Sequence, residues 1–217
     1  MTETIAQAST ERGDIVLRRR QDGALELRVN GVFVMDDRET RSEELLATAA
    51  LDVYTTDDPR RLLVGGLGLG YTVRALLGDE RVREVVVAEI EPDLVAWMRD
   101  GLVPSVIDDP RVTVLLGDVR QVVADRPDRS LDGILLDVDN GPDFLVYDAN
   151  AAVYQPVFLA DCRRKLRPGG ALTVWSSSDS EPLAQAIRAT FGACRVRPVP
   201  VDLQGRDETY FVYQASS

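Results

Sequence analysis

The sequence predicts an α/β fold: a seven-stranded, mostly parallel sheet that ends in an antiparallel hairpin, preceded by a small β-meander. Two observations support this prediction. After residue 59, short apolar runs alternate with amphipathic segments, which is typical of parallel strands covered by helices on both faces. Before that point, single residues alternate in polarity around Asp22–Gly23 and Asn30–Gly31, two dipeptides that favour tight hairpin turns.

The first third of the chain is expected to hold three kinds of structure. Residues 1–13 are polar and predict a flexible tail. Residues 14–56 should contain the β-meander, over 14–36, and a linking helix at Ser42–Leu51 that Ser42 caps. Residues 57–217 should form a cofactor-binding catalytic domain.

This larger part shows strict alternation of strands and helices without any internal repeat. The predicted strands are Leu62–Val64, Glu84–Ala88, Val112–Leu116, Gly133–Leu136, Ala171–Trp175, Arg195–Val201 and Thr209–Gln214. The predicted helices are Tyr71–Leu77, Pro92–Arg99, Val119–Ala124, Ala151–Leu166 and Glu181–Thr190. Because only a short turn at Gln204–Gly205 separates the last two strands, they should be antiparallel to each other.

Composition narrows the class of protein. Hydrophobic residues make up 45% of the chain and charged residues 28%, as in an ordinary globular protein. No apolar run approaches the roughly 20 residues that cross a bilayer, so we expect a cytoplasmic protein with no membrane partner. The net charge of −11 opposes binding to a phosphate backbone, so despite Arg18–Arg19–Arg20 we expect no nucleic-acid partner.

The chain contains no histidine, which excludes a histidine general base and the common histidine-ligated metal sites. Its two cysteines, Cys162 and Cys194, lack the spacing of metal ligands, so we expect no metal site. Proton transfer must therefore use carboxylates, tyrosines, cysteines, lysine or water.

A glycine-rich loop separates the first strand of the α/β part from its helix. Glycines allow the backbone to turn tightly and approach a ligand, while the helix N-terminus presents free N–H groups. The loop lacks the Lys-Ser/Thr that completes a P-loop. The residues expected to contact a cofactor here are Gly65, Gly66, Gly68, Leu69 and Gly70.

Acidic residues follow the next three strands, and in an open α/β sheet such strand ends converge on one crevice. Glu89, with Ile90, is placed to accept from ribose hydroxyls. Asp118, with Val119, is placed to hold an adenine amino group. Asp137 and Asp139 follow the fourth strand. NAD would also use the loop and the first acid, but the dinucleotide fold requires neither the terminal hairpin nor the acid after the third strand.

Together these segments resemble the spermidine synthase family of aminopropyltransferases. The resemblance covers residues 14–215 and is carried by Val64–Gly70, Glu89–Glu91, Asp109–Val114, Gly117–Asp118 and Asp137–Pro142. It implies a Rossmann-like class I methyltransferase fold. It also implies that Glu89 holds the ribose, that Asp118 holds the adenine, and that Asp137 lies beside the reacting centre.

The chain departs from the family pattern at several polar positions. The family's loop aspartate, which grips the amine of decarboxylated S-adenosylmethionine, corresponds here to Leu69. Of the family's Tyr-(His/Gln)-Glu triplet only Glu44 is kept, and Val34 replaces a glutamine. Unit charges about 4 Å apart interact by a few kcal/mol at partly buried sites, so losing the loop acid would favour a donor that keeps its carboxylate. We therefore expect intact S-adenosylmethionine as the cofactor.

Three functions remain open. The leading hypothesis is methyl transfer from S-adenosylmethionine to an amine or hydroxyl of a small molecule, with Asp137 and Asp139 orienting or deprotonating the acceptor. The alternatives are polyamine aminopropyl transfer from the decarboxylated cofactor, and a non-catalytic nucleoside-binding protein. The residues expected to contact the acceptor are Glu44, Asn140, Tyr147 and Trp175. The meander is a candidate homodimer contact, since short hairpins are marginal alone.

Overall fold

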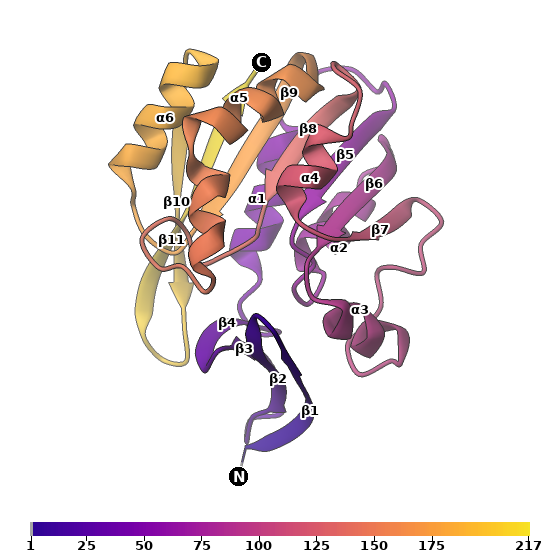
Figure 1. Cartoon of the computed structure of the whole chain (residues 1–217), viewed down its shortest axis with the longest axis vertical. Helices are drawn as coiled ribbons and strands as arrows, with labels where there is room; N and C mark the ends of the chain where they lie inside the picture. The colour runs from indigo at the N-terminus through magenta and orange to yellow at the C-terminus, as the bar shows by residue number, and fades with distance from the viewer. Residues whose placement is uncertain (1) are drawn as a thin grey trace.

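The computed structural model describes residues 2–217 and contains two sheets (Figure 1). A four-stranded antiparallel sheet, in the order β1-β2-β3-β4, comes from the N-terminal part. A seven-stranded sheet has the order β10-β11-β9-β8-β5-β6-β7. Its strands β5 to β9 pair in parallel, whereas β11 runs antiparallel to both β9 and β10. The predicted mostly parallel sheet with a terminal antiparallel hairpin is confirmed.

The elements follow one another in the predicted sequence. The smaller sheet and its link comprise β1 (Glu3–Thr10), β2 (Gly13–Arg19), β3 (Leu25–Val29), β4 (Val32–Asp36) and α1 (Arg41–Leu51). The first half of the larger part comprises β5 (Arg60–Gly65), α2 (Tyr71–Leu77), β6 (Val82–Glu89), α3 (Pro92–Arg99), β7 (Val112–Leu116) and α4 (Val119–Ala124). The second half comprises β8 (Leu131–Leu136), a 3-10 helix η1 (Asp148–Tyr154), α5 (Pro156–Lys165), β9 (Leu166–Ser176), α6 (Glu181–Phe191), β10 (Arg195–Asp202) and β11 (Asp207–Ser216).

Two apolar layers hold the larger sheet between its helices. Helices α4, α5 and α6 lie on the face turned to the viewer in Figure 1, and α1 and α2 lie behind it. Because side chains alternate along a strand, Leu62 and Val64 of β5 belong to the core on the α1 side, and Leu63 belongs to the core on the α5 side. All three are fully buried, which explains the continuous apolar runs of these strands.

Two predicted elements were wrong. Residues 3–10, expected within a flexible tail, form β1 and pair antiparallel with β2. This strand carries mostly small or polar side chains and none of its residues is fully buried, so its hydrophobic alternation is too weak to detect. The helix expected over 151–166 is α5 preceded by η1: Pro156 is the first helical residue, and the residue before a proline disfavours helical geometry.

The N-terminal sheet lies near the carboxyl ends of the parallel strands. Strands β5 and β8 are neighbours, and the chain leaves them toward opposite faces of the larger sheet. Ligands of open α/β sheets bind at such a point. The fold therefore places a crevice between the end of β5, the end of β8 and the N-terminal sheet.

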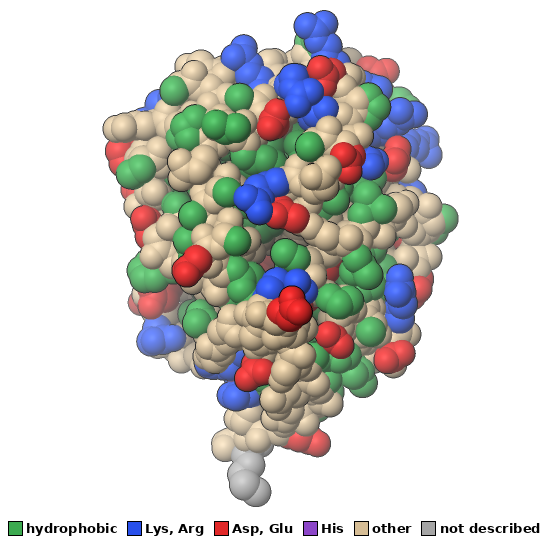
Figure 2. All heavy atoms as spheres, in the orientation of Figure 1, with side chains coloured by type: hydrophobic (Ala, Val, Ile, Leu, Met, Phe, Trp, Pro, Cys, Tyr) green, Lys and Arg blue, Asp and Glu red, His purple; other side chains and the backbone are tan. Residues whose placement is uncertain are grey.

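Two further features concern the surface. Within residues 2–217, no helix combines the length and the apolar character that crossing a membrane requires. On the face shown in Figure 2, acidic and basic side chains are interspersed. The proposed dimer contact through the N-terminal sheet stays a prediction.

Candidate functional site

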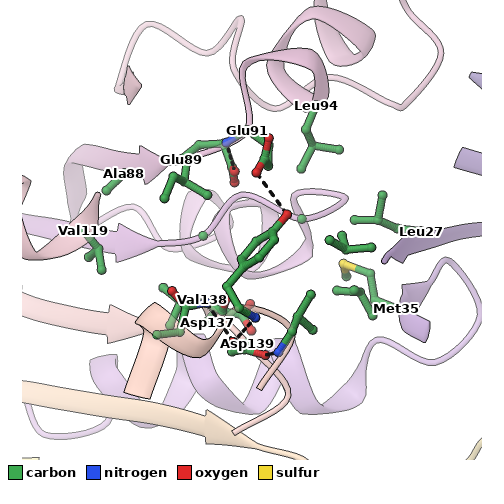
Figure 3. A pocket seen from close by; sticks show the side chains of 18 of the residues that line it. Leu27, Met35, Ala88, Glu89, Glu91, Leu94, Val119, Asp137, Val138 and Asp139 are labelled. Carbon is green, nitrogen blue, oxygen red and sulfur yellow. Dashed lines mark hydrogen bonds between the residues drawn. The ribbon is translucent and has the colours of Figure 1, made fainter. Parts of the chain in front are cut away.

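One pocket occupies this crevice (Figure 3). It is enclosed by the carboxyl ends of β5, β6, β7 and β8 and by the facing side of the N-terminal sheet. Its empty space, including the mouth open to solvent, is about 980 Å³. In Figure 3, Ala88 and Val119 border one side of the pocket, and Leu27 and Met35 border the opposite side.

Close contacts shape the glycine loop: Gly66 lies against backbone, and Gly68 lies against a methionine side chain. Gly66 has a φ of 89°, and a Cβ there would lie 2.0 Å from the carbonyl oxygen of Asp137. Gly68 has a φ of 51°, and a Cβ there would lie 2.6 Å from Sδ of Met35. Both glycines line the pocket, so the backbone of the loop forms part of its wall.

The other three loop residues predicted to contact the cofactor do not line the pocket. Leu69 is 2% exposed and belongs to the apolar core, while its N–H points to Sδ of Met35 at 3.2 Å. Gly65 and Gly70 pack against apolar side chains. The loop position that faces the ligand space is therefore Gly68 rather than Leu69, and Met35 fills the volume that a side chain at this position would need.

A pair of buried acids lies beside the loop. Asp137, at the end of β8, accepts a hydrogen bond from the hydroxyl of Thr72 at 2.7 Å. Burial raises the pKa of Asp137 to about 6, and the bond from Thr72 opposes this shift. Glu43 on α1 also lines the pocket; burial, and then the charge of Asp137, raise the pKa of Glu43 to about 8. At neutral pH the pair therefore holds close to one proton.

Glu43 replaces Glu44 as the acid that α1 contributes. Glu44, predicted to contact the acceptor, is exposed, and its carboxylate accepts from the hydroxyl of Thr40 at 3.0 Å. Glu43 is 6% exposed and faces the pocket. Adjacent residues of a helix face different directions, and the sequence alone does not show which of these two acids faces the pocket.

Asp139 was predicted to act together with Asp137. In the structure its carboxylate accepts hydrogen bonds from the loop that follows it. Its carboxylate accepts from the backbone N–H of Asn140 at 2.7 Å, from the N–H of Val146 at 2.6 Å, and from the side-chain amide of Asn150 at 2.7 Å. These bonds fasten residues 140–150 over the pocket. Asp139 therefore positions the loop, and Asp137 is the carboxylate left for a ligand.

Glu89 ties the second strand end to the glycine loop. One carboxylate oxygen accepts from the N–H of Leu67 and the other from the N–H of Glu91, both at 2.7 Å. Burial raises its pKa, and these bonds oppose the shift. Glu89 and Ile90 both line the pocket, and their contact with a ribose stays a prediction.

A bridge across the pocket was missed by the sequence analysis. The hydroxyl of Tyr147 donates to Glu91 at 3.0 Å, the bond drawn as a dashed line at Glu91 in Figure 3. Arg12, in the turn between β1 and β2, donates to the same carboxylate at 2.6 Å and to the carbonyl of Ile90 at 2.9 Å. Arg12 fell within the predicted flexible tail, so nothing marked it as part of a site.

Asp118 lies at the third strand end and has two roles. It lines the pocket and also caps α4, because its carboxylate accepts from the N–H of Arg120 at 2.8 Å. The guanidinium of Arg120 lowers its pKa. Val119 lines the pocket next to it.

Two further residues predicted to contact the acceptor substrate, Asn140 and Trp175, also line the pocket. Asn140 donates its side-chain amide to the carbonyl of Phe33 at 3.2 Å and so ties the loop to β4. Trp175, at the end of β9, packs edge-on against Tyr210 with ring centroids 4.9 Å apart. Its Nε1 is buried and has no hydrogen-bond partner within the described chain.

The charges around the pocket are one-sided. Its lining includes six acidic residues and neither lysine nor arginine: Glu43, Glu89, Glu91, Asp118, Asp137 and Asp139. Arg12 and Arg120 form ion pairs with two of them from the border. Among the described residues, no such ion pair reaches the other four. The pocket is therefore suited to a ligand that carries positive charge.

The fold and the pocket define the class: a Rossmann-like protein with a crevice at the carboxyl ends of its strands. No protein-family model matches the chain. The chain is 32% identical over 167 residues to polyamine aminopropyltransferase 2 of Pseudomonas aeruginosa. The matched segment covers 70% of this chain and 45% of the relative. It is 30% identical over 183 residues to polyamine aminopropyltransferase of Nitrosomonas europaea, covering 78% of this chain and 53% of the relative. The chain thus spans about half the length of these curated relatives.

Solved structures agree on the fold. A spermidine synthase in complex with the transition-state analogue AdoDATO superimposes with a TM-score of 0.86 and 17% identity, over 99% of this chain and 73% of that one. Spermidine synthase from Thermotoga maritima gives a TM-score of 0.84, also with 17% identity, over 99% and 72%. This chain belongs to the spermidine synthase family of polyamine aminopropyltransferases.

Proposed function

We propose that this chain transfers the aminopropyl group of decarboxylated S-adenosylmethionine to an amine. The observation that carries the proposal is the charge of the pocket, whose lining contains six acidic side chains and no basic one. The names of the curated relatives support aminopropyl transfer rather than the methyl transfer expected from the sequence.

Charge selects between the two donors. Both donors carry a sulfonium, but only intact S-adenosylmethionine also carries a carboxylate. That carboxylate would lie near Asp137 and Glu43 with no lining cation to neutralise it. Like charges about 4 Å apart repel by about 4 kcal/mol at the effective dielectric of a partly buried site, and each 1.4 kcal/mol is tenfold in affinity. The decarboxylated donor avoids this repulsion and offers an ammonium instead.

Glu43 supplies the acid that the glycine loop lacks. The expectation of an intact cofactor relied on the missing loop aspartate alone. In the structure, the Met35 side chain occupies the space beside Gly68, and Glu43 brings a buried carboxylate into the same pocket from α1. An ammonium next to Glu43 would draw this acid into its ionised form.

The transfer itself is a displacement at carbon. The neutral amine nitrogen of the acceptor attacks the aminopropyl carbon bound to sulfur; that carbon–sulfur bond breaks, and its electron pair stays on the sulfur as a neutral thioether. The attacking nitrogen then loses one proton. Asp137 is the available acceptor for this proton, because its pKa near 6 leaves it ionised at neutral pH. Thr72 fixes the orientation of the Asp137 carboxylate.

The other residues hold the donor and exclude water. We assign the ribose hydroxyls to Glu89, which is fixed by two backbone N–H groups, and the adenine to the side bordered by Asp118 and Val119. Tyr147, bonded to Glu91, lies over the site from the loop that Asp139 anchors. Positioning of this kind can supply several kcal/mol of the barrier.

The test is a turnover assay with both donors. The protein is incubated with decarboxylated or intact S-adenosylmethionine and a panel of primary amines, and the thioether nucleoside released is quantified by chromatography. We expect release of methylthioadenosine from the decarboxylated donor. Release of S-adenosylhomocysteine from the intact donor at a higher kcat/KM would overturn the proposal.

A further inference from the structure

One arginine of the N-terminal sheet contacts the wall of the pocket from outside. Arg12 lies in the turn between β1 and β2 and does not line the pocket itself. The N–H of Arg12 donates to the hydroxyl of Thr10 at 3.1 Å, and its carbonyl accepts from the side-chain amide of Asn30 at 3.2 Å. The backbone position of Arg12 is therefore set by its own sheet.

The side chain of Arg12 leaves this sheet and binds the turn that follows β6. Its Nε and Nη2 donate to the two carboxylate oxygens of Glu91 at 2.6 and 3.1 Å, and Nη2 also donates to the carbonyl of Ile90 at 2.9 Å. Such a two-pronged pair between a guanidinium and a carboxylate fixes orientation as well as distance. Arg12 thereby holds two consecutive residues of the turn in one geometry.

This turn carries residues that we assign to the donor nucleoside. Glu89, Ile90 and Glu91 all line the pocket. The carboxylate of Glu89, assigned to the ribose, accepts from the N–H of Glu91 at 2.7 Å, so a shift of Glu91 changes the setting of the ribose-binding group. A residue that fixes Ile90 and Glu91 from outside therefore acts on the donor through them.

This ion pair differs from a pair between two exposed side chains, which contributes little. Glu91 is only 4% exposed. Within residues 2–217, Tyr147 is the only other side chain that donates to the Glu91 carboxylate. Without Arg12, a nearly buried carboxylate would keep a single bond from a neutral group. Glu91 would then rotate or take up a proton, and the geometry of the turn would change.

We propose that Arg12 is a positioning residue for the donor, which fixes the Glu89–Glu91 turn and so couples docking of the N-terminal sheet to nucleoside binding. The inference rests on the proposed function, which assigns the donor ribose to Glu89. It requires no contact between Arg12 and the donor, because Arg12 acts through Ile90 and Glu91.

The first experiment measures the affinity for methylthioadenosine, the neutral product of the proposed transfer, by titration calorimetry. Because this ligand is uncharged, the lost charge of Arg12 does not act on it directly. Arg12→Gln should raise the dissociation constant at least tenfold. Arg12→Lys keeps the charge but not the two-pronged geometry, and should raise it at least fivefold. Arg19→Gln, an exposed position on β2, is the control and should stay within twofold of the unmodified protein.

Three calorimetric results would overturn the inference: an unchanged dissociation constant in Arg12→Gln, full affinity in Arg12→Lys, or an equal loss in Arg19→Gln. Turnover assays add a second readout. Arg12→Gln should raise KM for the decarboxylated donor at least fivefold, with kcat and the KM for the amine changed less than threefold. An equal rise in both KM values would assign Arg12 to the general integrity of the pocket and would also overturn the inference.

A further measurement uses only the unmodified protein, so it does not depend on how a variant folds. Coupling is reciprocal, so bound methylthioadenosine should slow amide hydrogen exchange in β1 and β2 at least tenfold. Slower exchange at the end of β6 without any change in β1 and β2 would overturn the inference. If the unmodified protein neither binds methylthioadenosine nor releases it with any amine, the proposed function falls, and the inference falls with it.

Discussion

Donor binding should expel a proton from Glu43. With its pKa raised to about 8 by burial and then by the charge of Asp137, this acid holds most of a proton at pH 7 and little of one at pH 9. An ammonium about 4 Å away stabilises the ionised form by about 4 kcal/mol, which lowers the pKa by about three units. Binding the decarboxylated donor should therefore release most of one proton at pH 7 and almost none at pH 9.

Titration calorimetry measures this number. Binding enthalpies are recorded in buffers of different ionisation enthalpy, such as phosphate and Tris, and the slope gives the protons exchanged. Glu43→Gln cannot ionise and should release almost no proton. Exposed Glu44→Gln is the control and should behave as the unmodified protein. No proton release at pH 7 by the unmodified protein, or the same release by Glu43→Gln, would refute the assignment of the donor amine to Glu43.

Three further outcomes follow from the site. Asp137→Asn should lower kcat by about 10²–10⁴ and remove the fall in activity below about pH 6; an unchanged acid limb would exclude Asp137 as the proton acceptor. Gly66→Ala should lower the free energy of unfolding by at least 2 kcal/mol, or about 4–8 °C in Tm, because its Cβ meets a backbone oxygen. Gly192→Ala, with a similar φ of 91° but open space around it, is the control, and an equal loss in both would refute the packing explanation. Tyr147→Phe removes the bond to Glu91 and should raise KM for the acceptor about tenfold with Tm unchanged; a drop in Tm alone would assign this bond to stability.

The α/β part could be predicted because its signals are local. Buried parallel strands are continuous apolar runs, and prolines and glycines mark the boundaries between elements. The sequence did not predict strand β1. An edge strand is held mainly by backbone hydrogen bonds, and its small and polar side chains give no strand pattern in the sequence. Helix α5 begins later than predicted because the 3-10 helix η1 precedes Pro156. The hydrophobic pattern does not distinguish η1 from α5.

The site was predictable at the strand ends and not elsewhere. Glu89, Asp118 and Asp137 follow strands, so topology alone brings them together. The orientation of Glu43 against Glu44, and of Gly68 against Leu69, depends on which way each residue faces after packing. The contact of Arg12 with Glu91 joins residues 79 positions apart through a turn of the N-terminal sheet, and no sequence pattern encodes it.

The most direct test of the central claim, that this pocket is built for a positively charged donor, is the ratio of two dissociation constants. Decarboxylated and intact S-adenosylmethionine are titrated into the same protein at pH 7.5 and low salt. We predict at least 100-fold tighter binding of the decarboxylated form, as one uncompensated carboxylate near Asp137 and Glu43 requires. Equal affinities, or tighter binding of the intact form, would contradict the account.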